Sequence, residues 1–250
     1  MTAVRAFALM VMVTWLPSAA HAQEPCQLTP MGTATVASVR DGRTLLLADG
    51  RELRLAGIEV TEASHTALQR LVGQQTLRLE KLKSDHDRYG RLLAYAFAAE
   101  GQPSVQQILL EQGEARVSAR IGDKACAEAL LKAENAARAA RRGLWADPNF
   151  APLQADNLVR LGSARGHFAL VEGKVLSVRV SGGTIYLNFG RRWTRDFSVI
   201  IPRRNQRSFA AAGLEPTRLE GRRIRVRGFV ERRRGPIIEA DAPEQIETID

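Results

Sequence analysis

The sequence predicts an α+β protein made mainly of β-strands and arranged as two strand-rich units. Three observations support this class. Short runs of alternating apolar and polar residues recur between residues 33 and 98, and again between residues 171 and 240. Stretches with helical spacing lie among the strands of the first unit. Residues 147–166 hold two prolines and two glycines without a sustained period, which predicts a linker between the units.

The first 22 residues have the pattern of an export signal. Arg5 supplies a positive start, Ala6–Leu16 is apolar, and Ala20-His21-Ala22 offers a cleavage site of small residues. The apolar run is too short to span a bilayer. We therefore expect a protein exported to the periplasm or medium without a membrane anchor, with residues 23–32 as its N-terminal tail.

The first unit, residues 33–146, is predicted to contain five short strands and three helices. Asp49-Gly50 is a strong hairpin signal, because both positions tolerate positive φ. Gly73 and Gly113 are expected to end helices. The predicted strands cover residues 33–40, 44–48, 51–58, 76–83 and 92–98, and the helices cover 62–72, 104–112 and 125–142. A small unit of this kind suits a five-stranded barrel of the OB type.

The second unit, residues 167–250, is predicted to be a smaller OB-like β-barrel. Its expected strands cover residues 171–180, 184–189, 197–201, 222–231 and 236–240, with a helix at 206–212. Five strands with a helix between the third and the fourth is the order of an OB-fold.

Charged residues gather where strands of the first unit end. The segment Val39–Glu62 is expected to deliver Asp41, Arg54, Glu59 and Glu62 to one end of the sheet, and Arg91 joins them from the turn that precedes the next strand. Guanidinium groups match phosphate oxygens in a bidentate manner, and a nearby carboxylate can activate water. The set is typical of chemistry on a phosphate group.

Three motifs in this order resemble the staphylococcal nuclease (thermonuclease) family. They are Asp41-Gly42 with Thr44, R-L-x-x-I-[D/E]-x-x-E at residues 54–62, and D-x-Y-G-R at residues 87–91. The resemblance runs from about residue 33 to residue 145. It implies an OB-type barrel that hydrolyses nucleic acid, with Arg54, Glu62 and Arg91 as the catalytic residues.

The resemblance also implies a calcium ion, and here the sequence departs from the family. The family's ligands fall on Arg43, Glu59 and the carbonyl of Val60, while Asp41 and Glu62 lie near the ion through water. Calcium prefers a cluster of oxygen ligands, and the cation of Arg43 repels it. We expect Arg43 to point toward these carboxylates, where it pairs with Glu59 or reaches a substrate phosphate. Asp41 and Glu59 remain as candidate ligands of a doubtful calcium site.

Two cysteines, Cys26 and Cys126, remain after the predicted signal. An even number in an exported chain favours a disulfide. The alternative is a buried thiol, because Cys126 shares a helix face with Leu130 and Ala133.

The net charge of +9 is concentrated in the second unit, where residues 151–250 hold 18 Lys/Arg against 11 Asp/Glu. Alternation along residues 222–230 predicts one face that carries arginines, and further basic and aromatic side chains lie in nearby loops. The candidate nucleic-acid-binding residues are Arg223, Arg225, Arg227, Arg191, Arg192 and Trp193. A solvated basic face is the alternative, and anionic lipid or polysaccharide would contact the same residues. Tyr186 and Trp193 are of types that stack on bases, although either could serve in packing.

Three functions follow from these patterns. The first is an exported nuclease that acts on DNA or RNA. The second is a nucleic-acid-binding protein of the same fold that has lost catalysis. The third is an envelope adaptor that binds an anionic partner.

Overall fold

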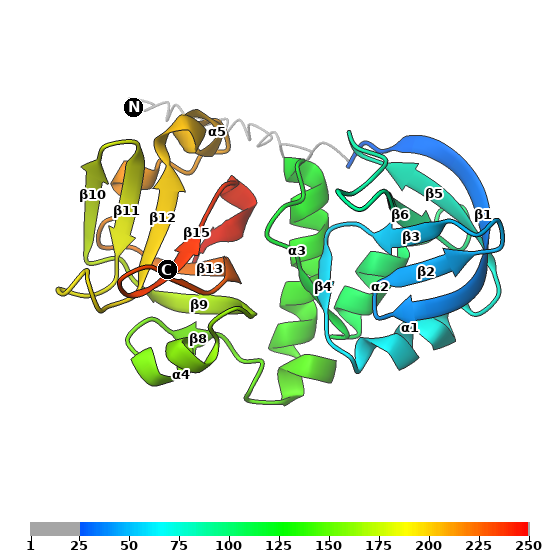
Figure 1. Ribbon diagram of the computed structural model, residues 1–250, viewed down its shortest axis with the longest axis horizontal. Coiled ribbons are helices and arrows are strands. Elements are labelled where there is room, and N and C mark those ends of the chain that lie inside the picture. The colour runs from blue at the N-terminus through cyan, green and yellow to red at the C-terminus, as the bar shows by residue number, and fades with distance from the viewer. Residues whose placement is uncertain (1–25, 250) are drawn as a thin grey trace, which may run out of the picture.

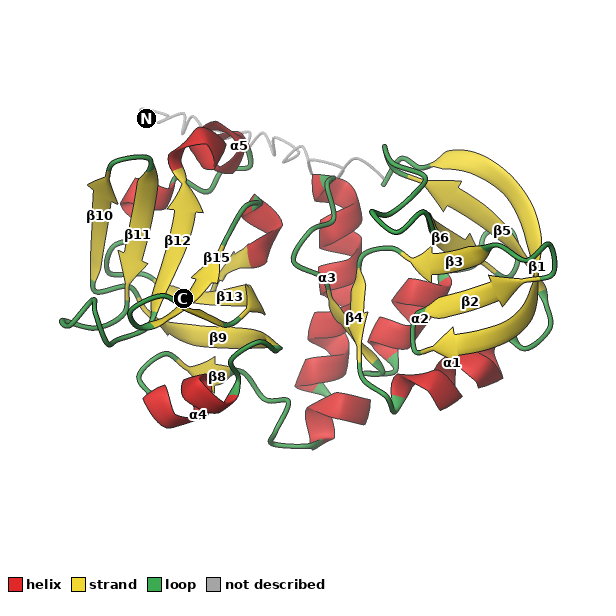
Figure 2. Ribbon diagram, viewed as in Figure 1, coloured by secondary structure: helices red, strands yellow, loops and turns green. Residues whose placement is uncertain are grey.

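The computed structural model describes residues 26–249, which form two strand-rich units on either side of one long helix, α3 (Lys124–Ala139) (Figure 1). Strands outnumber helices in both units (Figure 2). The predicted export signal lies outside the described residues. None of the described helices has the length and apolarity needed to cross a membrane.

Five strands of the first unit close into a barrel, in the order β1-β2-β3-β6-β5. The strands are β1 (Thr29–Asp41), β2 (Thr44–Leu47), β3 (Glu52–Leu55), β5 (Thr76–Lys81) and β6 (Leu92–Phe97). Strand β1 pairs with both β2 and β5, and β3 pairs in parallel with β6. Buried leucines from alternate positions of these strands fill the interior. The five predicted strands of this unit therefore exist and close into a barrel.

Two further short strands and two helices complete the first unit. Strand β4 (Ile58–Val60) pairs with β7 (Ala115–Val117), and the helices are α1 (Ser64–Val72) and α2 (Val105–Glu111). The predicted strand over residues 51–58 is wrong in one respect, because it breaks into β3 and β4. Gly57 at the break has φ +77°, a conformation that ends strand pairing. Strand β7 was not predicted, since three residues carry too little pattern to recognise.

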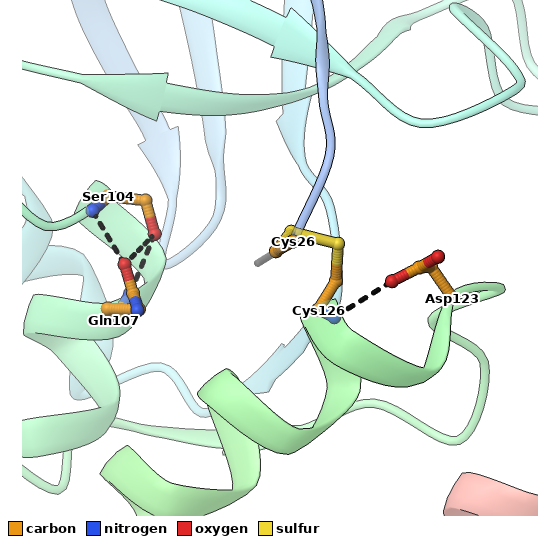
Figure 3. The surroundings of a disulfide bond; sticks show 5 residues. All are labelled: Cys26, Ser104, Gln107, Asp123 and Cys126. Atoms are coloured by element: carbon orange, nitrogen blue, oxygen red, sulfur yellow. Dashed lines mark hydrogen bonds between the residues drawn. A yellow bond between two sulfur atoms is a disulfide. The ribbon is translucent and has the colours of Figure 1, made fainter. Parts of the chain in front are cut away.

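A disulfide ties the start of the described chain to α3, as predicted. Cys26 precedes β1, and Cys126 lies in the first turn of α3 (Figure 3). The side chain of Asp123 caps this turn by accepting a hydrogen bond of 2.9 Å from the backbone N–H of Cys126. The nearby helix α2 begins with a capping box between Ser104 and Gln107 (Figure 3).

The second unit contains a five-stranded sheet and a four-stranded sheet. The order in the first is β10-β11-β12-β15-β14, and in the second it is β16-β13-β9-β8. Its strands are β8 (Leu153–Gln154), β9 (Phe168–Lys174), β10 (Ser177–Ser181), β11 (Thr184–Asn188), β12 (Ser198–Pro202), β13 (Arg223–Phe229), β14 (Glu231–Arg232), β15 (Pro236–Glu239) and β16 (Ile246–Thr248). Its helices are α4 (Leu158–Ser163) and α5 (Gln206–Ala211), and three short 3₁₀ helices cover 203–205, 216–218 and 243–245. A fourth 3₁₀ helix, at 143–146, follows α3 at the end of the first unit.

The strand pairings of the second unit have the same order of antiparallel and parallel directions as those of the barrel. In both units two antiparallel pairings lead to one parallel pairing, β3 with β6 and β12 with β15. The ladder of the second unit is interrupted between β9 and β10 and between β13 and β14, so it is divided into two sheets. Part of the predicted linker is also structured, because Leu153 and Leu161 are buried in the core of this unit.

The two units meet at α3 through a buried ion pair. Arg227 of β13 is fully buried and donates hydrogen bonds to Glu134 of α3 at 2.8 Å and to Glu247 of β16 at 2.6 Å. Arg227 also reaches the carbonyl of Val117 at 3.1 Å. Although burial alone would raise the pKa of Glu247, its pairs with Arg227 and Arg225 hold that pKa below the ordinary value.

Candidate active site

The turn between β1 and β2 lies tightly against the turn that precedes α1. Gly42 has no side chain, and a Cβ there would come within 2.6 Å of the Ser64 Cβ and 3.1 Å of the Thr61 carbonyl oxygen. Ser64 is buried and fixes its own turn, since its Oγ accepts from the Thr61 N–H at 3.1 Å and donates to the Glu114 carbonyl at 2.6 Å. Asp41-Gly42 therefore sits beside the segment that carries Glu62, as the motif predicts.

Arg43 pairs with Glu59 at the position where the family would hold calcium. The Nη1 of Arg43 lies 2.6 Å from the Glu59 carboxylate and 2.8 Å from the Ile58 carbonyl oxygen. Both side chains are largely buried, with 18% and 14% of their surface exposed. Asp41 is turned to the backbone, where it accepts from the Arg43 N–H at 2.8 Å.

These residues do not fit a calcium ion. A guanidinium already neutralises Glu59, whose other oxygen lies 3.4 Å from the Ser118 hydroxyl. Calcium binds to clusters of oxygen ligands that are free of competing cations. Among residues 26–249, no group of three or more histidine, cysteine or acidic side chains is placed to hold a metal.

Arg54 projects from β3 into a pocket of about 270 Å³. Leu53 and Leu55 on either side face the barrel core, so alternation places Arg54 on the outside. Within the described chain its guanidinium makes no hydrogen bond or ion pair. Burial lowers the pKa of Arg54, and the neighbouring cation Arg43 lowers it further, but a guanidinium stays charged at neutral pH. Arg54 is therefore a charged donor available to a ligand.

Arg91 is held by its own turn. Its Nε lies 2.8 Å and its Nη2 2.6 Å from one carboxylate oxygen of Asp87, while the other oxygen accepts from the backbone N–H groups of Tyr89 and Arg91. Burial alone would raise the pKa of Asp87, but these hydrogen bonds keep it below its ordinary value. The turn precedes β6, which pairs with β3. Arg91 is therefore close enough to Arg54 for its positive charge to lower the pKa of Arg54.

Glu62 lies apart from the other predicted catalytic residues. It is exposed in the turn before α1, and its carboxylate makes no hydrogen bond or ion pair within residues 26–249. Neither Glu62 nor Arg91 lines the pocket that holds Arg54 and Glu59. The structure thus brings Arg43, Arg54 and Glu59 together with Arg91 nearby, whereas Glu62 makes no hydrogen bond or ion pair with any of these described residues.

The pocket has walls that the motifs did not indicate. Tyr95 is buried with its hydroxyl unpaired, and burial raises the pKa of that hydroxyl. The opposite wall is the loop Ser118–Gly122. Glu244 of the second unit accepts from the backbone N–H groups of Ile121 and Gly122 at 3.1 Å and 3.0 Å, and Arg120 pairs with Asp241. No local sequence signal links these segments, which are more than 100 residues apart.

The predicted basic face of β13 needs a correction. Arg225 is paired with Glu172 at 2.6 Å and with Glu247 at 3.4 Å, and Arg227 is fully buried against α3. Alternation correctly placed these arginines on one face of the strand, but along that face Arg227 meets the first unit and Arg225 meets carboxylates of the second. Of the three, only Arg223 is exposed. Arg191, Arg192 and Trp193 do lie in an exposed loop, as predicted.

Comparison with known proteins agrees with the barrel and its motifs. The family model of staphylococcal nuclease homologues matches residues 54–147, a stretch that includes both arginine motifs and α3. No curated protein matches the chain. Residues 54–147 are therefore similar to the staphylococcal nuclease homologue family.

Proposed function

We propose that this protein is an exported nuclease that hydrolyses phosphodiester bonds of DNA or RNA. The observation that carries the proposal is Arg54, a charged guanidinium without a carboxylate partner in a pocket of the nuclease-homologue domain. The guanidinium groups of Arg43 and Arg91 lie near it, and their positive charges lower the pKa of Arg54. An anionic phosphate would relieve the repulsion among these cations.

We assign each of Arg54, Arg91 and Glu62 a role in the reaction. Arg54 binds the non-bridging oxygens of the scissile phosphate and stabilises the charge that grows as the phosphorus becomes five-coordinate. Arg91, aligned by Asp87, is the second donor. Glu62 takes a proton from the attacking water while the new P–O bond forms. The bond to the leaving oxygen then breaks, and that oxygen takes a proton from solvent.

The guanidinium of Arg43 supplies part of the positive charge that a metal ion would otherwise bring to this site. It neutralises Glu59, which would otherwise repel the phosphate. No step of this mechanism passes through calcium, because the residues around Glu59 do not fit the ion.

The second candidate is a nucleic-acid-binding protein without catalysis. The position of Glu62 favours it, since the exposed carboxylate is not held against either arginine.

Cleavage of labelled single-stranded DNA and RNA by the mature protein separates the two candidates. Glu62→Gln should keep the fold and lower kcat by about 10²–10⁴-fold. Arg54→Lys should also be severe, because an ammonium group cannot replace the planar fork of a guanidinium. Arg70→Lys is the matched control, since Arg70 is exposed on α1 and lines none of the pockets described here. Wild-type protein that binds but never cleaves would establish the second candidate.

We propose export because the Cys26–Cys126 disulfide persists in oxidising compartments. N-terminal sequencing of the protein recovered outside the cytoplasm should begin at Gln23. An intact N-terminus and a cytoplasmic location would contradict export. We also propose that the second unit is an OB-like barrel divided into two sheets, which its order of pairings supports.

A further inference from the structure

The second unit has a groove of about 890 Å³ on its five-stranded sheet. Ile185, Leu187 and Val199 face the core of this unit. The alternate residues of β11 and β12 therefore point outward and form the floor of the groove. They include Tyr186 and Ile200, which lie opposite each other in the strand register.

The floor continues across a third strand to a basic side chain. Arg179 of β10 lies opposite Tyr186 in the register, so Arg179, Tyr186 and Ile200 make one row across three strands. Arg179 is exposed and makes no hydrogen bond or ion pair within the described residues. An aromatic ring thus lies between an aliphatic side chain and an available cation.

Two loops form the rim at one end of the sheet. In the loop of residues 190–196, the Arg192 N–H donates to the Asp196 carboxylate and the Asp196 N–H donates to the Arg192 carbonyl, both at 2.8 Å. Gly235 brings the hairpin β14–β15 against this loop, because a Cβ there would lie 2.7 Å from the Asp196 carbonyl oxygen. The contact places Arg234 over the ring of Trp193, 5.0 Å from its centroid.

The groove combines exposed aromatic surface with positive charge. Trp193 is 51% exposed despite its size. Four arginines and no acidic residue appear among the described residues that line the groove; the arginines are Arg179, Arg191, Arg233 and Arg234. Of these, Arg233 has an acidic partner, Glu239 at 3.0 Å.

We propose that this groove binds single-stranded nucleic acid. Bases would stack on Trp193 and Tyr186, while the arginines contact the phosphates that connect them. A duplex hides the faces of its bases and offers mainly phosphates and groove edges, so it would leave both rings unused. A phospholipid headgroup needs the cations, but it needs neither the ring of Tyr186 on the floor nor that of Trp193 on the rim. The inference rests on the proposed nuclease function and adds to it a second site, which shares no lining residue with the Arg54 pocket.

Binding of a fluorescent 12-residue thymidine oligonucleotide to the full mature protein tests the groove. Anisotropy is recorded with chelator present, and a gel checks that the oligonucleotide is intact. Trp193→Ala and Tyr186→Ala should each weaken binding by roughly 5- to 100-fold, the loss expected for one stacked base. Arg179→Gln should reduce the slope of log affinity against log salt by about 1. Arg207→Gln is the matched control, because Arg207 is exposed on α5 and does not line the groove.

Fluorescence supplies an independent signal. Trp193 is exposed and Trp145 is buried, so quenching by the oligonucleotide should come from Trp193 and vanish in Trp193→Ala. A blunt duplex of the same length should bind wild type and both aromatic variants equally. Unchanged affinity of the aromatic variants for the single strand would overturn the proposal. So would quenching by vesicles of anionic phospholipid without quenching by the oligonucleotide, which would identify a lipid site.

The test separates this inference from the nuclease proposal. A protein that binds through the groove but never cleaves defeats the nuclease and leaves the groove standing. A protein that cleaves, and whose aromatic variants bind the single strand as wild type does, defeats the groove alone.

Discussion

At the scale of single residues, the site is defined by which cations have partners. Arg43 is neutralised by Glu59, and Arg91 is aligned by Asp87. Arg54 lies between them without a carboxylate of its own. Two paired arginines therefore shape the surroundings of an unpaired one, which is the group available to a phosphate.

The close approach at Gly42 gives a prediction about Glu62. In Gly42→Ala the new methyl would overlap Ser64, so the turn that carries Glu62 must move. We expect a loss of about 1–3 kcal/mol in the free energy of unfolding, typical of overpacking, together with a lower kcat. Chemical denaturation and the cleavage assay measure the two effects.

Gly183→Ala is the control for that substitution. Gly183 lies in the β10–β11 turn without positive φ, and a Cβ there would meet no atom within 4 Å. It should leave both quantities unchanged. Equal stability and rate for the two alanine variants would show that the approach at Gly42 does not position Glu62.

At the scale of elements, patterns within short stretches of sequence predicted the strands, but they did not predict contacts between distant parts of the chain. Alternation and turn residues located the five barrel strands, because each strand places one face in the core. The same reasoning predicted which residues of β13 share a face, but not what that face contacts. Alternation gives the same sequence pattern whether an arginine is exposed to solvent or, like Arg227, buried against Glu134. The partner lies on α3, 93 residues away in sequence.

The candidate site divides in the same way. Arg54 and Arg91 were found because they belong to short motifs with fixed spacing. Tyr95 and the loop Ser118–Gly122 were missed, since only the closed barrel and the second unit bring them to the pocket. The pair of Arg43 and Glu59 was one of two expected outcomes, and the geometry selects it over direct contact with a ligand.

Helix α3 joins these long-range contacts. The Cys26–Cys126 disulfide ties its first turn to the start of β1 and closes a loop with a sequence separation of 100. Closing a loop of that length lowers the conformational entropy of the unfolded chain. Loss of such a bridge typically lowers the free energy of unfolding by about 2–5 kcal/mol. Farther along the same helix, Glu134 pairs with Arg227 of the second unit.

At the scale of the whole molecule, a buried ion pair joins the two units. Arg227→Met should lower the free energy of unfolding by roughly 3–5 kcal/mol, because it leaves the fully buried Glu134 without its closest cation. Arg207→Met is the control, since it removes an exposed arginine of the same unit. Urea denaturation followed by fluorescence and by circular dichroism provides the comparison. Equal midpoints for the two variants would mean that the buried pair does not hold the units together.

The same contacts argue against separating the first unit from the second. Cutting the chain after Asp147 would remove Arg227 from Glu134 and Glu244 from the loop that walls the Arg54 pocket. The second unit thus supports the candidate active site as well as offering a groove of its own. Variants of the full chain are therefore better probes of either site than a truncated one.

The most direct test of the account is cleavage of a labelled single strand by the mature protein, first in excess chelator and then with calcium added. The account predicts cleavage in chelator that calcium does not increase, and loss of cleavage in Arg54→Lys. In Arg43→Asp, which removes the cation and adds an oxygen ligand, the rate should rise with calcium as the ion binds. Wild-type cleavage that requires calcium, or no cleavage under either condition, would show that Arg54 does not work here without the metal.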